Sequence, residues 1–182
     1  MAFHPSERPI GVQIFGANPA VMAEAARMIQ DAGADFVDVN AGCPVPKIVK
    51  KGGGASLLRD LPLLGRVVEA VASAVSIPVG LKVRNGWSAD TLNAPETLRV
   101  AESSGAAVFA IHGRTREQLY RGDADWDVVR DLVPRTDLPI LGSGDIWTAQ
   151  DGLTRLAQTG CAGVMIGRAA ITDPWIFART QA

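Results

Sequence analysis

The residues best suited to chemistry lie at matched positions in the sequence, each near the end of a short apolar run. Three runs begin at a proline and carry a polar or catalytically useful residue four places later, as from Pro9 to Gln13. Three others begin at a glycine and end seven places later, as from Gly33 to Asn40. The six residues so placed are Gln13, Asn40, Lys82, His112, Ser143 and Gly167. Because parallel α/β folds bind ligands at the carboxyl ends of their strands, this register predicts one composite site.

Cys43 and His112 are the candidates for proton transfer. Cys43 follows the second run, in the segment 40–44 (NAGCP), where a cysteine can act as a nucleophile or as a proton donor. The alternative is a small apolar side chain that caps a turn. His112 could likewise be a core histidine whose nitrogens are satisfied by neighbours. Its shared register with Gln13 and Lys82 favours a functional role.

Lys82 lies inside an apolar run, where an unpaired ammonium group would be costly to bury. We therefore expect it to face an anionic or carbonyl group. A salt bridge to a carboxylate of the barrel, such as Asp38 or Asp145, would satisfy the same charge without any ligand.

Two glycine-containing loops predict a phosphate site. One is the segment 142–145 (GSGD) ahead of a helical stretch, and the other is the pair Gly167 and Arg168. Backbone N–H groups at a helix start and a bidentate arginine are suited to bind phosphate. The candidate residues are Ser143, Gly144, Asp145, Gly167 and Arg168. Alternatively, the glycines serve only to make tight turns.

The elements that must position these residues are six apolar runs that alternate with stretches of helical spacing, the pattern of repeated βαβ units. The predicted strands are 10–15, 35–39, 79–83, 107–111, 139–141 and 163–166, and the predicted helices are 19–32, 61–75, 95–103, 126–132 and 148–158. The runs introduced by a proline alternate along the chain with those introduced by a glycine. Such alternation is expected where alternate strands of a (β/α)8 TIM barrel supply alternate layers of side chains. Six units fall short of eight, so we expect an α/β fold with one partial-barrel domain over residues 1–182. Its two outer strands would be open apolar edges that favour dimerisation or aggregation.

The charge balance gives no strong overall attraction to a polyanion. The chain has 18 Lys and Arg and 19 Asp and Glu residues, a formal net charge of −1, so nucleic acid would have to be held by a local patch. Residues 44–68 carry five cations and one anion, and four arginines follow predicted strands: Arg84, Arg114, Arg116 and Arg121. A positive rim of this kind suits a polyanionic substrate, and a solvated helix face would explain the same charges.

The sequence also predicts the cellular compartment. No apolar stretch approaches the roughly 20 residues of a membrane span, and the first residues do not resemble a signal peptide. The two cysteines are far apart, which predicts neither a disulfide nor a metal site. We therefore expect a cytoplasmic protein without a membrane partner.

Taken together, these motifs resemble those of the tRNA-dihydrouridine synthases, most closely the bacterial B-type. The matching segments occur in the family's order and are 12–16 (VQIFG), 40–44 (NAGCP), 51–58 (KGGGASLL), 81–84 (LKVR), 111–115 (IHGRT), 144–146 (GDI) and 166–170 (IGRAA). The NAGCP element followed by the glycine-rich segment is specific to that family, whereas the others recur in other flavin barrels. Ser143 departs from the pattern, because the family usually has asparagine before Gly-Asp.

The resemblance implies a TIM barrel that binds FMN and reduces the C5–C6 double bond of a uridine in tRNA, with NADPH as reductant. It implies that Cys43 is the general acid that protonates C5 while hydride reaches C6, with Asn40 beside the uracil and Arg84 also binding substrate. The implied flavin contacts are Gln13 and Lys82 at the isoalloxazine and His112 at the flavin or its phosphate end. Ser143, Gly144, Asp145, Gly167 and Arg168 would form the phosphate and ribityl site.

The resemblance also implies a fragment, because the family's first two β/α units and its C-terminal helical domain have no counterpart here. Two alternative interpretations follow. One is another FMN barrel that reduces a small molecule, such as a dihydroorotate or enoate reductase, and the NAGCP context of Cys43 argues against it. The other is an inactive or RNA-binding remnant without flavin, and the shared register of Gln13, Lys82 and His112 argues against that.

Overall fold

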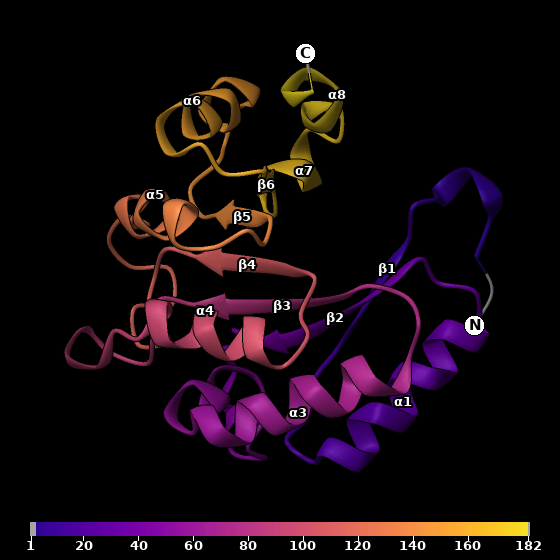
Figure 1. The fold of residues 1–182 in the computed structure, drawn as a ribbon. Helices are drawn as coiled ribbons and strands as arrows, with labels where there is room; N and C mark the ends of the chain where they lie inside the picture. The colour runs from indigo at the N-terminus through magenta and orange to yellow at the C-terminus, as the bar shows by residue number, and fades with distance from the viewer. Residues whose placement is uncertain (1–2, 182) are drawn as a thin grey trace.

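The computed structural model describes residues 3–181 and contains one sheet of six parallel strands, paired in the order of the chain. The strands are β1 (Gly11–Ile14), β2 (Phe36–Ala41), β3 (Val79–Arg84), β4 (Val108–His112), β5 (Ile140–Ser143) and β6 (Gly163–Met165). The sheet is curled, and β1 and β6 each have a strand partner on one side only (Figure 1). This arrangement confirms the predicted partial (β/α)8 barrel.

Helices connect successive strands and cover the convex side of the sheet (Figure 1). They are α1 (Pro19–Asp31), α2 (Pro46–Val49), α3 (Leu61–Ala74), α4 (Ala94–Ser103), α5 (Asp127–Leu132), α6 (Ala149–Thr159), α7 (Ala169–Thr172) and α8 (Ile176–Thr180). Short 3-10 turns are η1 (Pro5–Glu7), η2 (Gly54–Arg59), η3 (Ala89–Thr91) and η4 (Val133–Arg135). The five predicted helices agree with α1, α3, α4, α5 and α6 to within one residue at each end. Within residues 3–181, no helix has the length and apolar character needed to cross a membrane.

Local sequence signals fix where these helices begin and end. The side chain of Asn18 caps α1 by accepting a hydrogen bond of 3.0 Å from the N–H of Ala20. Three glycines follow helices with positive φ angles: Gly33 (87°), Gly105 (84°) and Gly160 (69°). This is the left-handed region that favours glycine at a helix end. Each glycine thus stops a helix and turns the chain into the next strand, as predicted.

The core lies between the helices and the convex face of the sheet. On β2, Val37 and Val39 are fully buried, whereas the intervening Asp38 and Asn40 are partly exposed. Because side chains alternate across a strand, Asp38 and Asn40 point to the concave side. The alternation therefore separates an apolar face that packs against helices from a concave face that carries the polar candidates.

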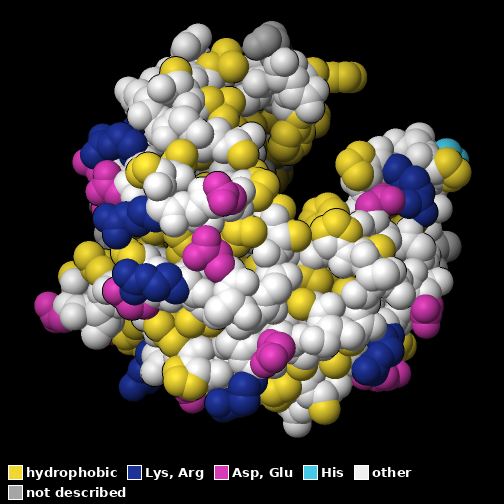
Figure 2. Space-filling view, viewed as in Figure 1, with side chains coloured by type: hydrophobic (Ala, Val, Ile, Leu, Met, Phe, Trp, Pro, Cys, Tyr) yellow, Lys and Arg dark blue, Asp and Glu magenta, His cyan; other side chains and the backbone are white. Residues whose placement is uncertain are grey.

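The concave face borders a hollow of about 570 Å³. Phe36, Val108 and Leu141 give it an apolar lining, and Gln13 and Asp38 add polar groups. The space-filling view shows the molecule hollowed between the part built by α6 to α8 and the N-terminal segment, with hydrophobic side chains at the margin (Figure 2). The open edges thus leave the inner face of the sheet accessible.

Candidate active site

A ladder of polar side chains crosses the first two strands at the concave face. Gln13 and Asp38 are paired in register, and Nε2 of Gln13 donates to Oδ2 of Asp38 at 2.5 Å. Nδ2 of Asn40 donates to Oε1 of Gln13 at 2.6 Å. Asn40 is in turn paired in register with Lys82 on β3. The structure therefore brings the predicted residues Gln13, Asn40 and Lys82 together.

Asn40 also fixes the loop that carries Cys43. Its Oδ1 accepts hydrogen bonds from the N–H of Gly42 at 3.0 Å and from the N–H of Cys43 at 2.8 Å. The carbonyl oxygen of Cys43 accepts from the N–H of Ala55 at 3.0 Å. These bonds hold a free, half-buried thiol at the end of β2.

Gly54 explains why a glycine-rich segment follows the cysteine. Its φ is 59°, and a Cβ at this position would stand 2.7 Å from the carbonyl oxygen of Cys43 and 3.1 Å from its Cβ. A side chain would therefore be strained and would collide with the loop. The glycine lets η2 pack directly against Cys43.

Lys82 faces the concave side, and its ammonium forms no ion pair with a carboxylate of residues 3–181. Burial and then the charge of Arg84 lower its pKa to about 8, and Asp38 partly offsets this. Its hydrogen bond is a long one of 3.4 Å to the carbonyl oxygen of Val83. Among the described residues it forms no salt bridge with Asp38 or Asp145, so the alternative of a salt-bridged lysine is not realised. Asp145 is instead paired with arginines.

His112 is neutral and has a defined tautomer. Burial and the nearby cations Lys82, Arg84 and Arg114 lower its pKa to about 3. Its Nδ1 accepts a hydrogen bond of 3.1 Å from the N–H of Arg114, so the proton lies on Nε2. His112 lines a pocket and presents an N–H donor rather than a charge.

That pocket, of about 160 Å³, lies at the ends of β4, β5 and β6. It is lined by the predicted His112, Ser143, Gly144, Asp145, Gly167 and Arg168, together with Tyr120, Ile146, Trp147 and Met165. Gly167 has open space where a Cβ would stand. It lies two residues beyond β6, which ends at Met165 and is shorter than predicted. The structure thus gathers the whole predicted phosphate set around one pocket.

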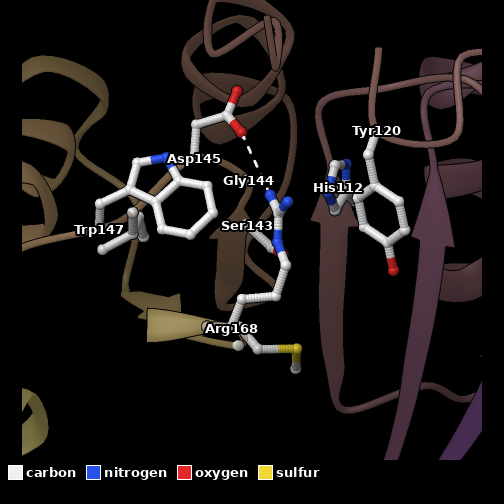
Figure 3. Close-up of a pocket in the computed structure, with 10 residues that line it drawn as sticks. His112, Tyr120, Ser143, Gly144, Asp145, Trp147 and Arg168 are labelled. Carbon is white, nitrogen blue, oxygen red and sulfur yellow. Dashed lines mark ion pairs between the residues drawn. The ribbon is translucent and has the colours of Figure 1, made fainter. Parts of the chain in front are cut away.

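Arg168 crosses this pocket between two aromatic rings. Its guanidinium carbon lies 4.4 Å from the ring centroid of Trp147 and 4.7 Å from that of Tyr120, and Figure 3 shows it between them. Its Nη2 is 3.6 Å from Oδ1 of Asp145, a loose ion pair. Stacking orients the guanidinium while leaving its in-plane N–H groups able to bind an anion.

Asp145 acts mainly as a scaffold for this pocket. Its Oδ2 accepts from Nη2 of the buried Arg114 at 2.6 Å and from the N–H of Ala124 at 2.8 Å. Burial raises the pKa of the Asp145 carboxyl, but these hydrogen bonds and the charges of Arg114 and Arg168 together outweigh it and hold the pKa below its usual value. The backbone of Asp145 has a φ of 52°, a conformation that aspartate tolerates better than most residues. The carboxylate therefore anchors the loop after β5 to the loop after β4.

Arg84 is 4% exposed, and its guanidinium donates hydrogen bonds to backbone carbonyl oxygens of the protein. Nε donates to the carbonyl oxygen of Gly42 at 3.1 Å, and Nη1 donates to those of Thr115 and Leu119, both at 2.9 Å. This geometry makes Arg84 a clamp that joins the Cys43 loop to the loop after β4. Its predicted contact with substrate stays a prediction.

Sequence reasoning did not assign three residues of the site. Asp38 lies two places before Asn40 on the same strand, and that spacing alone would have placed it on the same face. Tyr120 and Trp147 lie in loops between β4 and α5 and between β5 and α6. No periodic pattern marks them, because loop geometry brings them to Arg168.

Comparisons with known proteins identify the family of this chain. The family model described as "Dihydrouridine synthase (Dus)" matches residues 1–182. "Probable tRNA-dihydrouridine synthase" of Treponema pallidum is 45% identical over 97% of this chain and 55% of its own length. "tRNA-dihydrouridine synthase B" of Xanthomonas axonopodis is 44% identical over 93% of this chain and 51% of its own length, and that of Pseudomonas aeruginosa is 40% identical over 94% and 52%.

The solved structures that resemble this chain support the fold alone. A dipeptide epimerase from Enterococcus faecalis has a TM-score of 0.59 at 14% identity and covers 85% of this chain and 38% of its own. One from Cytophaga hutchinsonii has a TM-score of 0.58 at 18% identity, over 86% and 36%. The chain spans about half the length of the curated relatives that it matches. By its sequence, this chain belongs to the dihydrouridine synthase family.

Proposed function

We propose that this chain forms the catalytic part of a cytoplasmic, FMN-dependent tRNA-dihydrouridine synthase. It reduces the C5–C6 double bond of a uridine in tRNA, with NADPH as the reductant. The observation that carries the proposal is the Cys43 loop, which Asn40 holds at the same end of the sheet as Lys82, His112 and the phosphate pocket. The printed names of the relatives support the substrate class.

The described residues fit FMN. Arg168, with only a loose carboxylate partner, would bind the phosphate, and Ser143, Gly144 and Gly167 would border it. The Nε2–H of His112 would donate to the phosphate or the ribityl chain. Gln13 lines the hollow, and Lys82 lies on the same face of β3 as Gly80, which also lines it. Both side chains would contact the isoalloxazine ring. Bound reduced FMN supplies the hydride that is added to C6 of the uracil.

Lys82 would supply positive charge beside the flavin. With a pKa of about 8 it is mostly protonated at pH 7. A nearby negative charge favours the protonated form further. Because it forms no salt bridge with the carboxylates of residues 3–181, this ammonium would be able to stabilise negative charge near N1 and O2 of the ring.

Cys43 would supply the proton. As a C–H bond forms at C6, electrons shift to C5, and the Sγ–H of Cys43 transfers its proton there. The resulting thiolate takes a proton from solvent, which restores the thiol. The hydrogen bonds that Oδ1 of Asn40 accepts from the Cys43 loop would hold the thiol in place, and Arg84 donates to the same loop at the carbonyl oxygen of Gly42. The target base must leave its stack to reach this position.

The first experiment is the visible absorption spectrum of the purified chain, followed by release of the cofactor. We expect flavin bands and FMN. A colourless protein that takes up no added FMN would contradict the proposal.

The second experiment measures tRNA reduction with NADPH for Cys43→Ser and for the matched variant Cys161→Ser. Cys161 is buried, and its Sγ lies 3.2 Å from the carbonyl oxygen of Gly163, an acceptor that a hydroxyl can also use. We expect Cys43→Ser to lower the rate about 10²- to 10⁴-fold, the usual contribution of a general acid, while Cys161→Ser stays close to the wild-type rate. An unchanged rate for Cys43→Ser would exclude the proton-donor role.

A further inference from the structure

Three loops meet at Trp87, outside the pocket already described. Arg59 ends η2, Trp87 follows β3, and Arg116 follows β4. The guanidinium carbon of Arg59 lies 4.8 Å from the ring centroid of Trp87, and that of Arg116 lies 4.7 Å from it. We call Arg59, Trp87 and Arg116 the Trp87 cluster. It places two cations on one indole.

Neither arginine of the Trp87 cluster has an acidic partner within residues 3–181. Nε of Arg116 is buried without a hydrogen bond among the described residues, so stacking rather than hydrogen bonding holds this side chain. A stacked guanidinium keeps in-plane N–H groups for a bidentate anion. The indole therefore holds two guanidinium groups within 4.8 Å of its centroid, neither of them neutralised by a carboxylate of the described residues. An anion is the ligand that would balance this charge.

The cluster stands on a rigid base. The N–H of Arg116 donates to the carbonyl oxygen of Gly86, and the N–H of Glu117 donates to that of Trp87, both at 3.0 Å. Gly86 has a φ of 87°, and a Cβ there would stand 2.3 Å from the carbonyl oxygen of Thr91. These contacts lock the loops after β3 and β4 together. A ligand would meet groups that are already ordered, which lowers the entropic cost of binding.

The position of the cluster relates it to Cys43. The 3-10 turn η2 packs against Cys43 through Gly54 and ends at Arg59, while Trp87 lies three residues beyond the end of β3, which carries Lys82. The cluster thus stands at the same end of the sheet as the thiol, and it is absent from the lining of the phosphate pocket. We propose that the Trp87 cluster binds a phosphodiester group of the RNA backbone next to the target nucleotide. This inference rests on the proposed function, because it takes RNA as the substrate.

The test measures the binding of a fluorescently labelled, unmodified tRNA transcript over a series of salt concentrations. The variants are Arg59→Gln, Arg116→Gln and Trp87→Phe, and the control is Arg66→Gln. Arg66 is an exposed arginine of α3 without a salt bridge among the described residues, so it matches the charge change. Melting temperature and flavin content of each variant report on the fold and on the flavin site.

We expect each glutamine variant of the cluster to reduce the magnitude of the slope of log K against log[salt] by up to about 0.7 to 0.9, the effect of losing one phosphate contact. At 0.1 M salt this corresponds to roughly five- to eightfold weaker binding. Trp87→Phe, which keeps an aromatic face, should retain most of the affinity. Arg66→Gln should change the slope by much less.

Two outcomes would overturn the inference, and they differ in what else they overturn. If the wild type binds tRNA but Arg59→Gln and Arg116→Gln behave like Arg66→Gln, the cluster is only a structural contact and the proposed function stands. If the wild type shows no salt-dependent tRNA binding, the RNA substrate and this inference fail together. Arg59 is exposed, so Arg59→Gln keeps the test valid even if Arg116→Gln unfolds.

Discussion

Replacing Trp147 with alanine should weaken the binding of FMN and leave that of riboflavin unchanged. Trp147 lies 4.4 Å from the guanidinium carbon of Arg168 and is one of its two aromatic partners. Riboflavin lacks the phosphate, so the ratio of the two affinities isolates the contribution of this group. A variant that damaged the fold or the isoalloxazine contacts would lose both ligands equally.

The size of the effect follows from the contacts of Arg168. One cation–π contact at an exposed site contributes about 0.5–1 kcal/mol, and Arg168 is 45% exposed. Trp147→Ala should therefore raise the Kd of FMN roughly two- to fivefold. Arg168→Gln removes the charge itself, and a hydrogen bond to a charged group contributes about 1.5–3 kcal/mol, or roughly 10- to 150-fold in Kd.

Quenching of flavin fluorescence on titration with protein measures both affinities. Trp175→Ala is the matched control, because Trp175 is 73% exposed and does not line the pocket. Equal losses of FMN and riboflavin affinity in Arg168→Gln would show that the pocket does not hold the phosphate. An effect of Trp175→Ala as large as that of Trp147→Ala would refute the stacking argument.

Three further predictions concern stability and association. Asp145→Ala leaves the charge of Arg114, 3% exposed, without its carboxylate partner and should lower the free energy of unfolding by about 3–5 kcal/mol. Asp173→Ala removes the exposed ion pair with Arg179 and should lower it by less than about 1 kcal/mol. Equal losses in urea denaturation would contradict this. The pKa of His112 is lowered to about 3 in the folded chain, so the unfolded chain binds more protons between pH 3 and 6.5. The free energy of unfolding should therefore fall as the pH is lowered through that range. His112→Gln should flatten this dependence, and an unaltered dependence of the free energy of unfolding on pH would exclude His112 as its source. The unpaired edges of β1 and β6 should make the chain dimerise or aggregate when expressed alone; a monodisperse monomer in sedimentation, with a sharp thermal transition, would exclude this.

The sequence could predict the strand-end residues because their spacing is set by local geometry. A proline or a helix-ending glycine fixes where each strand starts, and a constant rise per residue then brings Gln13, Lys82 and Ser143 to corresponding positions. The parallel register pairs Asn40 with Lys82 and His112 with Ser143. Gln13 pairs instead with Asp38, and Lys82 with Ala110, so these pairs are offset by two residues from Asn40 and His112.

Other features could not be predicted because they depend on contacts between distant loops. Arg84 reaches carbonyl oxygens of Gly42, Thr115 and Leu119, up to 42 positions away in the sequence. The same composition is equally compatible with an arginine that points to solvent. The choice of Arg114 rather than Lys82 as the partner of Asp145 likewise depends on where the loop after β4 folds back.

The two ends of the proposed flavin site stand at the two open edges of the sheet. Gln13 lies on β1, and Arg168 follows β6. A ligand that contacts both must bridge the whole curl of the sheet, so its affinity depends on how far apart the edges lie. Pairing of another strand with β1 or β6 would fix that curl through backbone hydrogen bonds. Edge pairing and binding of the proposed flavin would therefore be thermodynamically linked: each would strengthen the other by the same factor through the curvature of the sheet.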